Sequence, residues 1–231
     1  LQRMCPPEIG HFTAELHRRN GVELRTAVSI AAIVEADGAL ALRTADGDTI
    51  AADVVLAGIG AQPNVELAEA ASLIVENGVV TDEFGRTSDP HIFAAGDVTR
   101  HFNPLLGRKV RLEAWQNAQN QAMAVAKIMA GGDQPYAEMP WFWSDQYDVN
   151  LQIAGAPEHW GQLIWRGGPN DKAFTVFTAR DGVPIAAITM NNGRDMRAAR
   201  ELITRRRPVD PTRLADAAVK LQDLAKEIGR G

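Results

Sequence analysis

Apolar residues recur with a helical period at the start of the chain and in short strand-like runs after it. Ile9, Phe12 and Leu16 fall on one face at helical spacing, which predicts a helix over residues 6–20 that ends at Asn20-Gly21. The Asp-Gly pairs at 37–38 and 46–47 predict tight turns between strands. The predicted strands cover residues 22–26, 28–36, 39–44 and 49–51, and a continuous apolar run predicts a strand buried on both faces at 53–58.

The middle of the chain alternates short elements with one long helix. Ala114, Ala118, Ala122 and Ala126 recur every four residues, so we expect this helix to pack closely on a sheet through a narrow alanine face. The predicted elements are a helix at 65–71, a strand at 91–95, a loop at 98–109 and the long helix at 112–129, which Gly131-Gly132 ends.

From Met139 onward the composition changes and a new domain is predicted. Trp141 and Trp143 alternate in an extended segment, so both indoles should point the same way. Strands are predicted at 150–155, 161–166, 172–179 and 183–190, with a hairpin turn at Asp181-Gly182. Two helices follow: one opens at Asn192 or Asp195 and runs to 205, and the other is capped by Asp210-Pro211 with a buried stripe of Leu214, Ala218, Leu221, Ala225 and Ile228. An antiparallel sheet with helices on one side is a small α+β domain.

Composition narrows the class of protein. The chain has 231 residues, 45% hydrophobic and 23% charged, with a net charge of −5, which gives no support for nucleic-acid binding. No apolar run approaches the length of a membrane span, and no secretory leader opens the chain. The single cysteine, Cys5, excludes an internal disulfide or dithiol pair. We therefore expect a cytoplasmic α/β protein, and the start at Leu1 without methionine suggests an excised fragment.

Residues 87–97 carry the clearest candidate chemistry, with the sequence Thr-Ser-Asp-Pro-His-Ile-Phe-Ala-Ala-Gly-Asp. A turn leads into the strand predicted at 91–95, whose side chains shrink to Gly96 before the carboxylate of Asp97. Small residues at the carboxyl end of a strand let a ligand approach the backbone, and a carboxylate suits the hydroxyls of a polyol. On the Gly-Asp dipeptide alone, a plain exit from strand to loop is the favoured interpretation.

The whole stretch is more specific than the dipeptide. Its pattern Thr-x-x-x-x-Ile-Phe-Ala-x-Gly-Asp resembles the second flavin-binding motif of the glutathione-reductase-like flavoproteins, which contain two dinucleotide-binding domains. Residues 111–121 (Arg-Leu-Glu-Ala-Trp-Gln-Asn-Ala-Gln-Asn-Gln) and 140–147 (Pro-Trp-Phe-Trp-Ser-Asp-Gln-Tyr) resemble the flavin-dependent ferredoxin reductases. Those enzymes serve aromatic-ring dioxygenases and bacterial haem monooxygenases, and the apoptosis-inducing-factor flavoproteins are related to them.

The resemblance implies a fold, two cofactors and a partner. We expect an α/β chain with the back half of an NAD(P)-binding domain at 1–80, the second segment of an FAD-binding domain at 81–135 and a C-terminal α+β reductase domain at 136–231. It also implies a carboxyl-terminal portion of an enzyme that passes electrons from NAD(P)H through FAD to a ferredoxin-type iron–sulfur carrier. A homodimer is possible, and the choice between NADH and NADPH is left open.

The same resemblance assigns roles to single residues. Gly96 and Asp97 would hold the flavin ribityl chain, and Trp143 would lie against the flavin, with Trp141 undecided. Glu113 and Trp115, expected in the first turn of the long helix, would contact flavin or nicotinamide. Without the family, Glu113 is an ordinary acid at a helix start and Trp115 is a packing residue. No catalytic side chain and no metal ligand are predicted, because the flavin supplies the chemistry.

Gly58-Ile-Gly60 invites comparison with a dinucleotide fingerprint. The third glycine is missing and Pro63 stands where the phosphate-binding helix would run, so this is not the pyrophosphate turn. The resemblance implies that Gly60 lies beside bound nicotinamide nucleotide, with a simple turn as the equal alternative.

Six arginines crowd residues 194–207, with only Asp195 and Glu201 as acids: Arg194, Arg197, Arg200, Arg205, Arg206 and Arg207. Such a run is usually a solvated face. In an acidic protein it also suits docking of an acidic ferredoxin, for which Arg194, Arg197 and Arg200 are the candidates.

Two other functions stay open. A disulfide reductase of the same superfamily ranks low because the chain lacks a dithiol pair. A non-catalytic dimerisation or docking module is the stronger rival, because no Gly-rich pyrophosphate turn is present in the chain.

Overall fold

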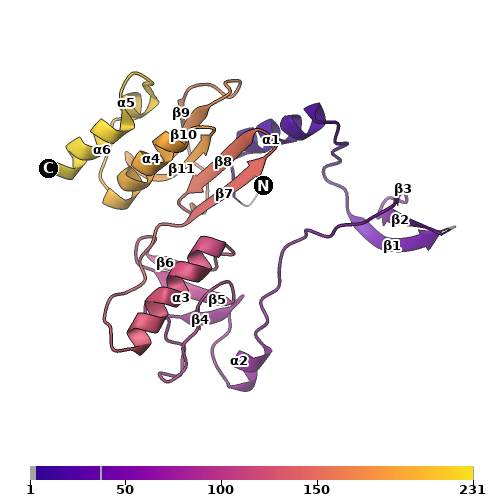
Figure 1. Ribbon diagram of the computed structural model, residues 1–231, viewed down its shortest axis with the longest axis horizontal. Helices are drawn as coiled ribbons and strands as arrows, with labels where there is room; N and C mark the ends of the chain where they lie inside the picture. Colours follow the sequence, from indigo (N-terminus) through magenta and orange to yellow (C-terminus); the bar gives the residue numbers. More distant parts are fainter. Residues whose placement is uncertain (1–3, 37, 231) are drawn as a thin grey trace. The chain divides into compact units, whose positions relative to one another are not determined.

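The computed structural model describes residues 4–36 and 38–230. The described chain divides into two compact units. Residues 6–62 form the first, and residues 63–230, together with Met4 and Cys5, form the second. Figure 1 shows the elements of each unit in order.

The first unit holds one helix and a small antiparallel sheet, as the sequence predicts. Ala36 pairs with Ala39, which confirms the hairpin, although Asp37 of its turn lies outside the described residues. The sheet has the order β1-β2-β3. The elements are α1 (Pro7–Arg19), β1 (Ile30–Ala36), β2 (Ala39–Thr44) and β3 (Thr49–Ala52).

Two strands predicted in this unit are wrong. Residues 22–26 and 53–58 are extended coil, and the side chains of Val54, Leu56 and Ile59 are 73%, 92% and 95% exposed. A strand forms only where a neighbour takes up its backbone N–H and C=O groups. Among the described residues no strand pairs with either segment, so these two apolar stretches do not form strands.

The second unit opens with a three-stranded sheet of order β4-β5-β6, in which β4 and β5 are parallel and β6 is antiparallel. The side chains of Asn117, Gln121, Val125 and Ile128 are the buried ones of α3, the helix next to this sheet (Figure 1). The elements are α2 (Glu66–Ala70), β4 (Val79–Thr81), β5 (Thr99–Asn103), β6 (Arg108–Val110) and α3 (Trp115–Met129).

Three expectations for this region need correction. The strand at 91–95 does not form, and Phe93 makes only a single bridge to Arg86. The segment 98–109, expected as a loop, contains β5 and most of β6, because its alternating buried and half-buried side chains suit a hairpin. The prediction that α3 packs through its alanine face is also wrong. Ala122 and Ala126 are exposed, and the buried side chains of α3 are Asn117, Gln121, Val125 and Ile128.

A five-stranded antiparallel sheet with three helices makes the rest of the second unit. Its strand order is β7-β8-β11-β10-β9. The core lies between this sheet and α4, and Phe177, Ala199 and Leu202 are fully buried in it. The elements are β7 (Trp141–Gln146), β8 (Val149–Ala154), β9 (Leu163–Arg166), β10 (Phe174–Arg180), β11 (Val183–Met190), α4 (Gly193–Arg205), α5 (Pro211–Ala215) and α6 (Leu221–Arg230).

The second predicted helix of this domain is broken into α5 and α6. Asp210 caps α5 by accepting a hydrogen bond from the Thr212 backbone N–H at 2.8 Å, as expected. Ala218, predicted in the buried stripe, is exposed in the link. The link's carbonyl groups turn to the buried guanidinium of Arg166, which donates to Asp216, to Ala217 at 3.2 Å and to Val219 at 2.6 Å.

Candidate functional site

The Gly96-Asp97 turn is held against α3 by one buried side chain. Gly96 has a φ of 85°, which a residue with a side chain rarely adopts. Its backbone N–H donates to Gln121 Oε1 at 2.8 Å, and the Thr99 hydroxyl donates to the same oxygen at 3.2 Å. Thr99 also lies 2.8 Å from the carbonyl oxygen of Gly96. Since Gln121 is 1% exposed, the turn has a fixed place on the helix.

Asp97 is exposed at the tip of this fixed turn. Its carboxylate makes no hydrogen bond or ion pair with any residue that the structure describes. A carboxylate only accepts hydrogen bonds, so its oxygens are available to the hydroxyl groups of a ligand. This arrangement fits the polyol role predicted for Asp97.

The start of α3 offers unpaired donors. The helix begins at Trp115 with Ala114 as N-cap, and no described side chain caps it. Its first backbone N–H groups therefore have no acceptor within the helix, and the helix dipole favours negative charge beside them. Trp115 is 67% exposed. Glu113 lies before the helix rather than in its first turn, and it pairs with Arg111.

β7 presents a pair of stacked indoles. The rings of Trp141 and Trp143 lie 4.9 Å apart with an interplanar angle of 29°, which confirms that both point the same way. The guanidinium of Arg200 lies 5.1 Å from the Trp141 ring, so one face of the stack meets α4. Trp143 is 44% exposed and available to another aromatic ring.

The second unit brings the start of α3 beside the start of β7. Ala114, Gln116, Trp141 and Arg200 line one small cavity there, and Glu113 shares a second cavity with Phe142. Five of the six predicted site residues belong to this unit, namely Gly96, Asp97, Glu113, Trp115 and Trp143, and of these Glu113 alone lines either of the two cavities. Gly60 lies in the first unit, in a turn with a φ of 98°.

Sequence reasoning did not identify Gln121. It stands 25 residues after Gly96 in an alanine-rich helix, and only its 2.8 Å bond to Gly96 shows its role. Nor did the sequence indicate the polar layer beside α3, where the side chains of Thr81 and His101 have no hydrogen-bond partner among the described residues. The His101 ring lies 5.6 Å from that of Tyr136. Burial lowers the pKa of His101 to about 4, so this ring is neutral at pH 7.

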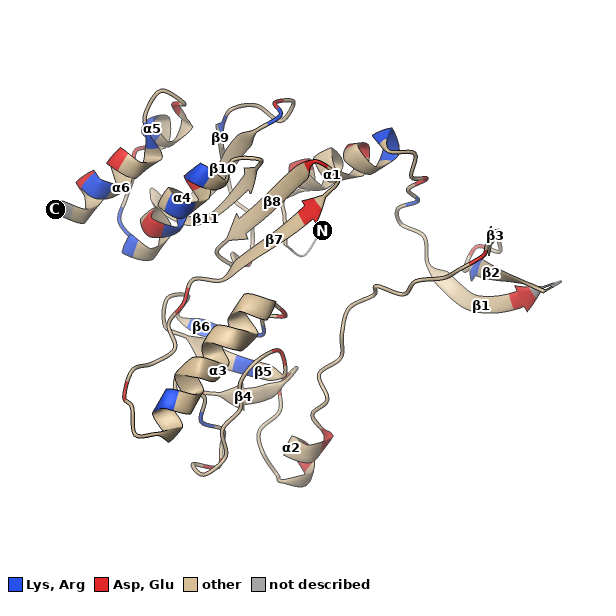
Figure 2. Cartoon of the chain, in the orientation of Figure 1, with Lys and Arg blue, Asp and Glu red and all other residues tan. Residues whose placement is uncertain are grey.

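The arginine run divides into paired and unpaired members. Arg205 pairs with Glu201. Asp195 is buried, 3.0 Å from Arg166, so its negative charge does not contribute to the surface of α4. Arg194 and Arg197 are exposed and form no ion pair with any residue of the described ranges. α4 therefore carries a net basic face (Figure 2).

The described residues contain neither a helix that could span a membrane nor a side-chain cluster that could hold a metal ion. In the described part of the chain no helix is long and apolar enough to cross a membrane. Within the same residues no group of three His, Cys, Asp or Glu side chains is placed to hold a metal ion.

Comparisons with known proteins identify the family of the chain. Residues 1–122 match the pyridine nucleotide-disulphide oxidoreductase family, and residues 141–225 match the reductase C-terminal family. The anthranilate 1,2-dioxygenase system ferredoxin–NAD(+) reductase component of Burkholderia cepacia is 48% identical over 96% of this chain and 55% of its own. Putidaredoxin reductase CamA of Pseudomonas putida is 37% identical over 97% of this chain and 54% of its own.

A solved structure gives the same result. The covalent putidaredoxin reductase–putidaredoxin complex matches 100% of this chain and 56% of that chain, with a TM-score of 0.94 and 36% identity. The chain therefore spans about half the length of the relatives it matches. The family match over residues 1–122 shows that the chain belongs to the pyridine nucleotide-disulphide oxidoreductases, and that it also carries a reductase C-terminal domain.

Proposed function

We propose that the protein acts as an FAD-dependent reductase that passes electrons from NAD(P)H to a ferredoxin-type iron–sulfur carrier of an oxygenase system. The observation that carries this proposal is the exposed Asp97 on a turn fixed by Gln121. Relatives named as reductases of ferredoxin and of putidaredoxin support it. The domain limits proposed from the sequence are 1–80 for NAD(P), 81–135 for FAD and 136–231 for the reductase domain.

The residues of the second unit fit FAD. When bound, FAD supplies hydride acceptance from the nicotinamide and release of single electrons. Asp97 would accept hydrogen bonds from the ribityl hydroxyls, and Gly96 would let the ligand approach the backbone. The free amide groups at the start of α3 stabilise negative charge on the bound group. Trp143 and Trp115 present exposed aromatic faces to ring systems.

Two further contacts are proposed with NAD(P)H. Glu113, just ahead of α3, would contact the edge of the nicotinamide or flavin ring at the helix start. Gly60 provides a turn with positive φ that leaves its surroundings open, since a Cβ there would meet no described atom within 4 Å. No side chain acts as acid, base or nucleophile. We place the protein in the cytoplasm, where NAD(P)H is available, and cell fractionation tests this location.

The flavin proposal is tested by colour and by one substitution. Protein incubated with FAD and then separated from unbound flavin by gel filtration should absorb at about 450 nm. Asp97→Ala should weaken FAD binding by about tenfold or more, because one charge-assisted hydrogen-bond acceptor is lost. Asp133→Ala removes another exposed carboxylate and serves as the control. Equal FAD affinity in the parent and in Asp97→Ala would refute the role of Asp97.

The carrier is proposed to dock on α4 through Arg194, Arg197 and Arg200. Complementary charge raises association rates more than affinity, so the effect should appear at low salt. Arg194→Glu with Arg197→Glu should slow ferredoxin reduction several-fold at low salt. The control, Arg18→Glu with Arg25→Glu, changes the net charge by the same amount in the first unit and should leave the rate unchanged. Arg200 is left intact because it contacts Trp141. Unchanged rates in the α4 variant would place docking elsewhere.

One alternative has a specific observation in its favour. The exposed apolar residues at 54–59 form a segment that could bind another protein, as expected of a docking module without cofactor. Colourless protein that does not take up added FAD would favour this reading. A disulfide reductase ranks low, because within this chain Cys5 is the single cysteine and is buried.

A further inference from the structure

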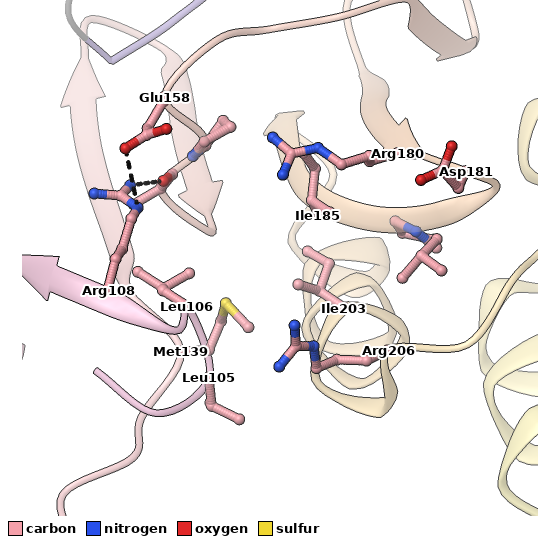
Figure 3. Close-up of a pocket in the computed structure, with 14 residues that line it drawn as sticks. Leu105, Leu106, Arg108, Met139, Glu158, Arg180, Asp181, Ile185, Ile203 and Arg206 are labelled. Carbon is pink, nitrogen blue, oxygen red and sulfur yellow. Dashed lines mark hydrogen bonds and ion pairs between the residues drawn. The ribbon is translucent and has the colours of Figure 1, made fainter. Parts of the chain in front are cut away.

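A cavity of about 350 Å³ opens inside the second unit, away from the residues proposed for FAD. One wall comes from the β5–β6 hairpin and the segment around Met139, and the other from the β10–β11 hairpin and the end of α4 (Figure 3). Its volume falls within the usual range for small-molecule sites, about 300–1,000 Å³. None of the six residues assigned to FAD or NAD(P)H lines it.

The two walls contribute apolar side chains to the middle of the cavity. Leu105, Leu106 and Met139 face it from one side, and Ile185 and Ile203 from the other (Figure 3). This apolar strip would bury the hydrocarbon part of a ligand, which is worth about 25 cal/mol per Å² of apolar surface removed from water.

The charges around the strip are unbalanced. Arg108 is already engaged, with Glu158 at 3.7 Å and the carbonyl oxygen of Ala156 at 2.5 Å. Arg180 and Arg206 extend toward the cavity in Figure 3, and neither forms an ion pair or a side-chain hydrogen bond with any residue in the described ranges. Asp181 also lines the cavity but pairs with no described cation. Two arginines therefore remain without a carboxylate.

We propose that this cavity binds a small organic carboxylate with a hydrocarbon body. Arg180 and Arg206 lie at opposite ends of one wall in Figure 3, with Ile185 and Ile203 between them. A carboxylate would bind at one of these two ends, where the planar guanidinium group matches its geometry and donates charge-assisted hydrogen bonds. The apolar strip between the walls takes the body. The wall residues come from segments some 80 residues apart in the chain, so a bound carboxylate would bridge the β6 side and the reductase domain.

Octanoate is a suitable probe, because it joins a single carboxylate to a flexible apolar chain. Titration calorimetry on the chain should show saturable binding, and methyl NMR should show shifts at Leu105, Leu106, Ile185 and Ile203. Replacing Arg180 and Arg206 together by glutamine should weaken octanoate binding by about tenfold or more. Arg43→Gln with Arg213→Gln removes two exposed arginines outside the cavity and should leave the affinity unchanged.

Two further titrations separate the parts of the proposal. Octanol tests the apolar strip without charge, and inorganic phosphate tests the arginines without a hydrocarbon body. The proposal predicts that octanoate binds more tightly than both. Failure of octanoate to saturate, equal binding of octanol or phosphate, or full affinity in the Arg180/Arg206 variant would each overturn it. These measurements need no flavin, so they are independent of the proposed reductase activity.

Discussion

His101 lies in β5 with 1% of its surface exposed, and neither ring nitrogen has a hydrogen-bond partner among the described residues. Desolvation lowers its pKa from 6.5 to about 4. Between these two values the unfolded chain binds the proton more readily than the native protein does. Stability from this residue is therefore fully present above pH 6.5 and is lost as the pH falls toward 4.

We expect the free energy of unfolding to fall by about 2 kcal/mol between pH 7.5 and pH 5 on account of His101. Urea denaturation at both pH values measures this difference. His101→Leu should remove this share of the pH dependence, while His159→Gln, which changes an exposed histidine, should keep it. An unaltered pH dependence in His101→Leu would contradict the assignment.

Gln121 acts on the site through the Gly96-Asp97 turn rather than by touching a ligand. Gln121→Leu keeps the volume but removes the acceptor that Gly96 and Thr99 share. The loss should destabilise the protein by about 1–3 kcal/mol, because the half-buried N–H of Gly96 is left without an acceptor. FAD affinity should fall as well, with Gln121→Glu restoring part of it. Gln134→Leu, at an exposed position, is the control; a turn that keeps full FAD affinity without Gln121 would show that the clamp is dispensable.

The residues that the sequence revealed and those it hid differ in a physical way. Asp97 can be predicted because its candidate chemistry is local: small residues and a carboxylate stand together in one motif. Gln121 is hidden because its contact joins positions far apart in the chain, and a glutamine in a helix is unremarkable until the fold buries it. His101 escaped notice for the same reason.

At the scale of elements, local patterns predict helices and hairpins better than isolated strands. α1, α4 and the β10–β11 hairpin follow from periodicity and turn residues within one segment. The strands expected at 22–26 and 53–58 depend on neighbours from elsewhere, and no described segment supplies them. The loop predicted at 98–109 contains β5 and most of β6, in which charged and polar residues interrupt the apolar pattern.

The break between α5 and α6 depends on a single arginine. Arg166 is buried, pairs with Asp195 and satisfies three carbonyl groups of the link. Arg166→Met should lower the free energy of unfolding by about 3–5 kcal/mol, because the buried Asp195 then loses its counter-charge and keeps only the neutral donors Thr175 and Asn192. Thermal unfolding followed by circular dichroism measures the change.

Arg213→Met is the matched control for this prediction. Its ion pair with Glu227, at 2.9 Å, is exposed and should contribute at most about 1 kcal/mol. Similar losses from both variants would mean that the buried pair is no more important than a surface one.

For the whole molecule, the two units differ in how much they bury. In the described first unit only a few side chains are buried, such as Ile9 and Ala41, whereas the second unit has a continuous core around Phe177 and Leu202. Segments with few buried contacts open most easily, and proteases cut them first. The coil at 22–29 and the extended segment at 53–62 are therefore the weakest parts of the chain.

Brief trypsin digestion should cut first after Arg25, and chymotrypsin after Leu56, leaving a resistant product that contains residues 63–230. Intact-mass spectrometry of the time course identifies the order of cuts. Early cleavage within 141–225, before either of these segments is cut, would contradict this ranking of the two units.

The paired indoles of β7 give the protein an internal optical reporter. Two chromophores 4.9 Å apart and 29° from parallel couple their electronic transitions, which should produce a circular dichroism couplet in the far ultraviolet. Since Trp143 is half open to solvent, a ring laid upon it would quench its emission and alter that couplet. Occupancy of this surface can thus be followed by light alone, without a label or an electron acceptor.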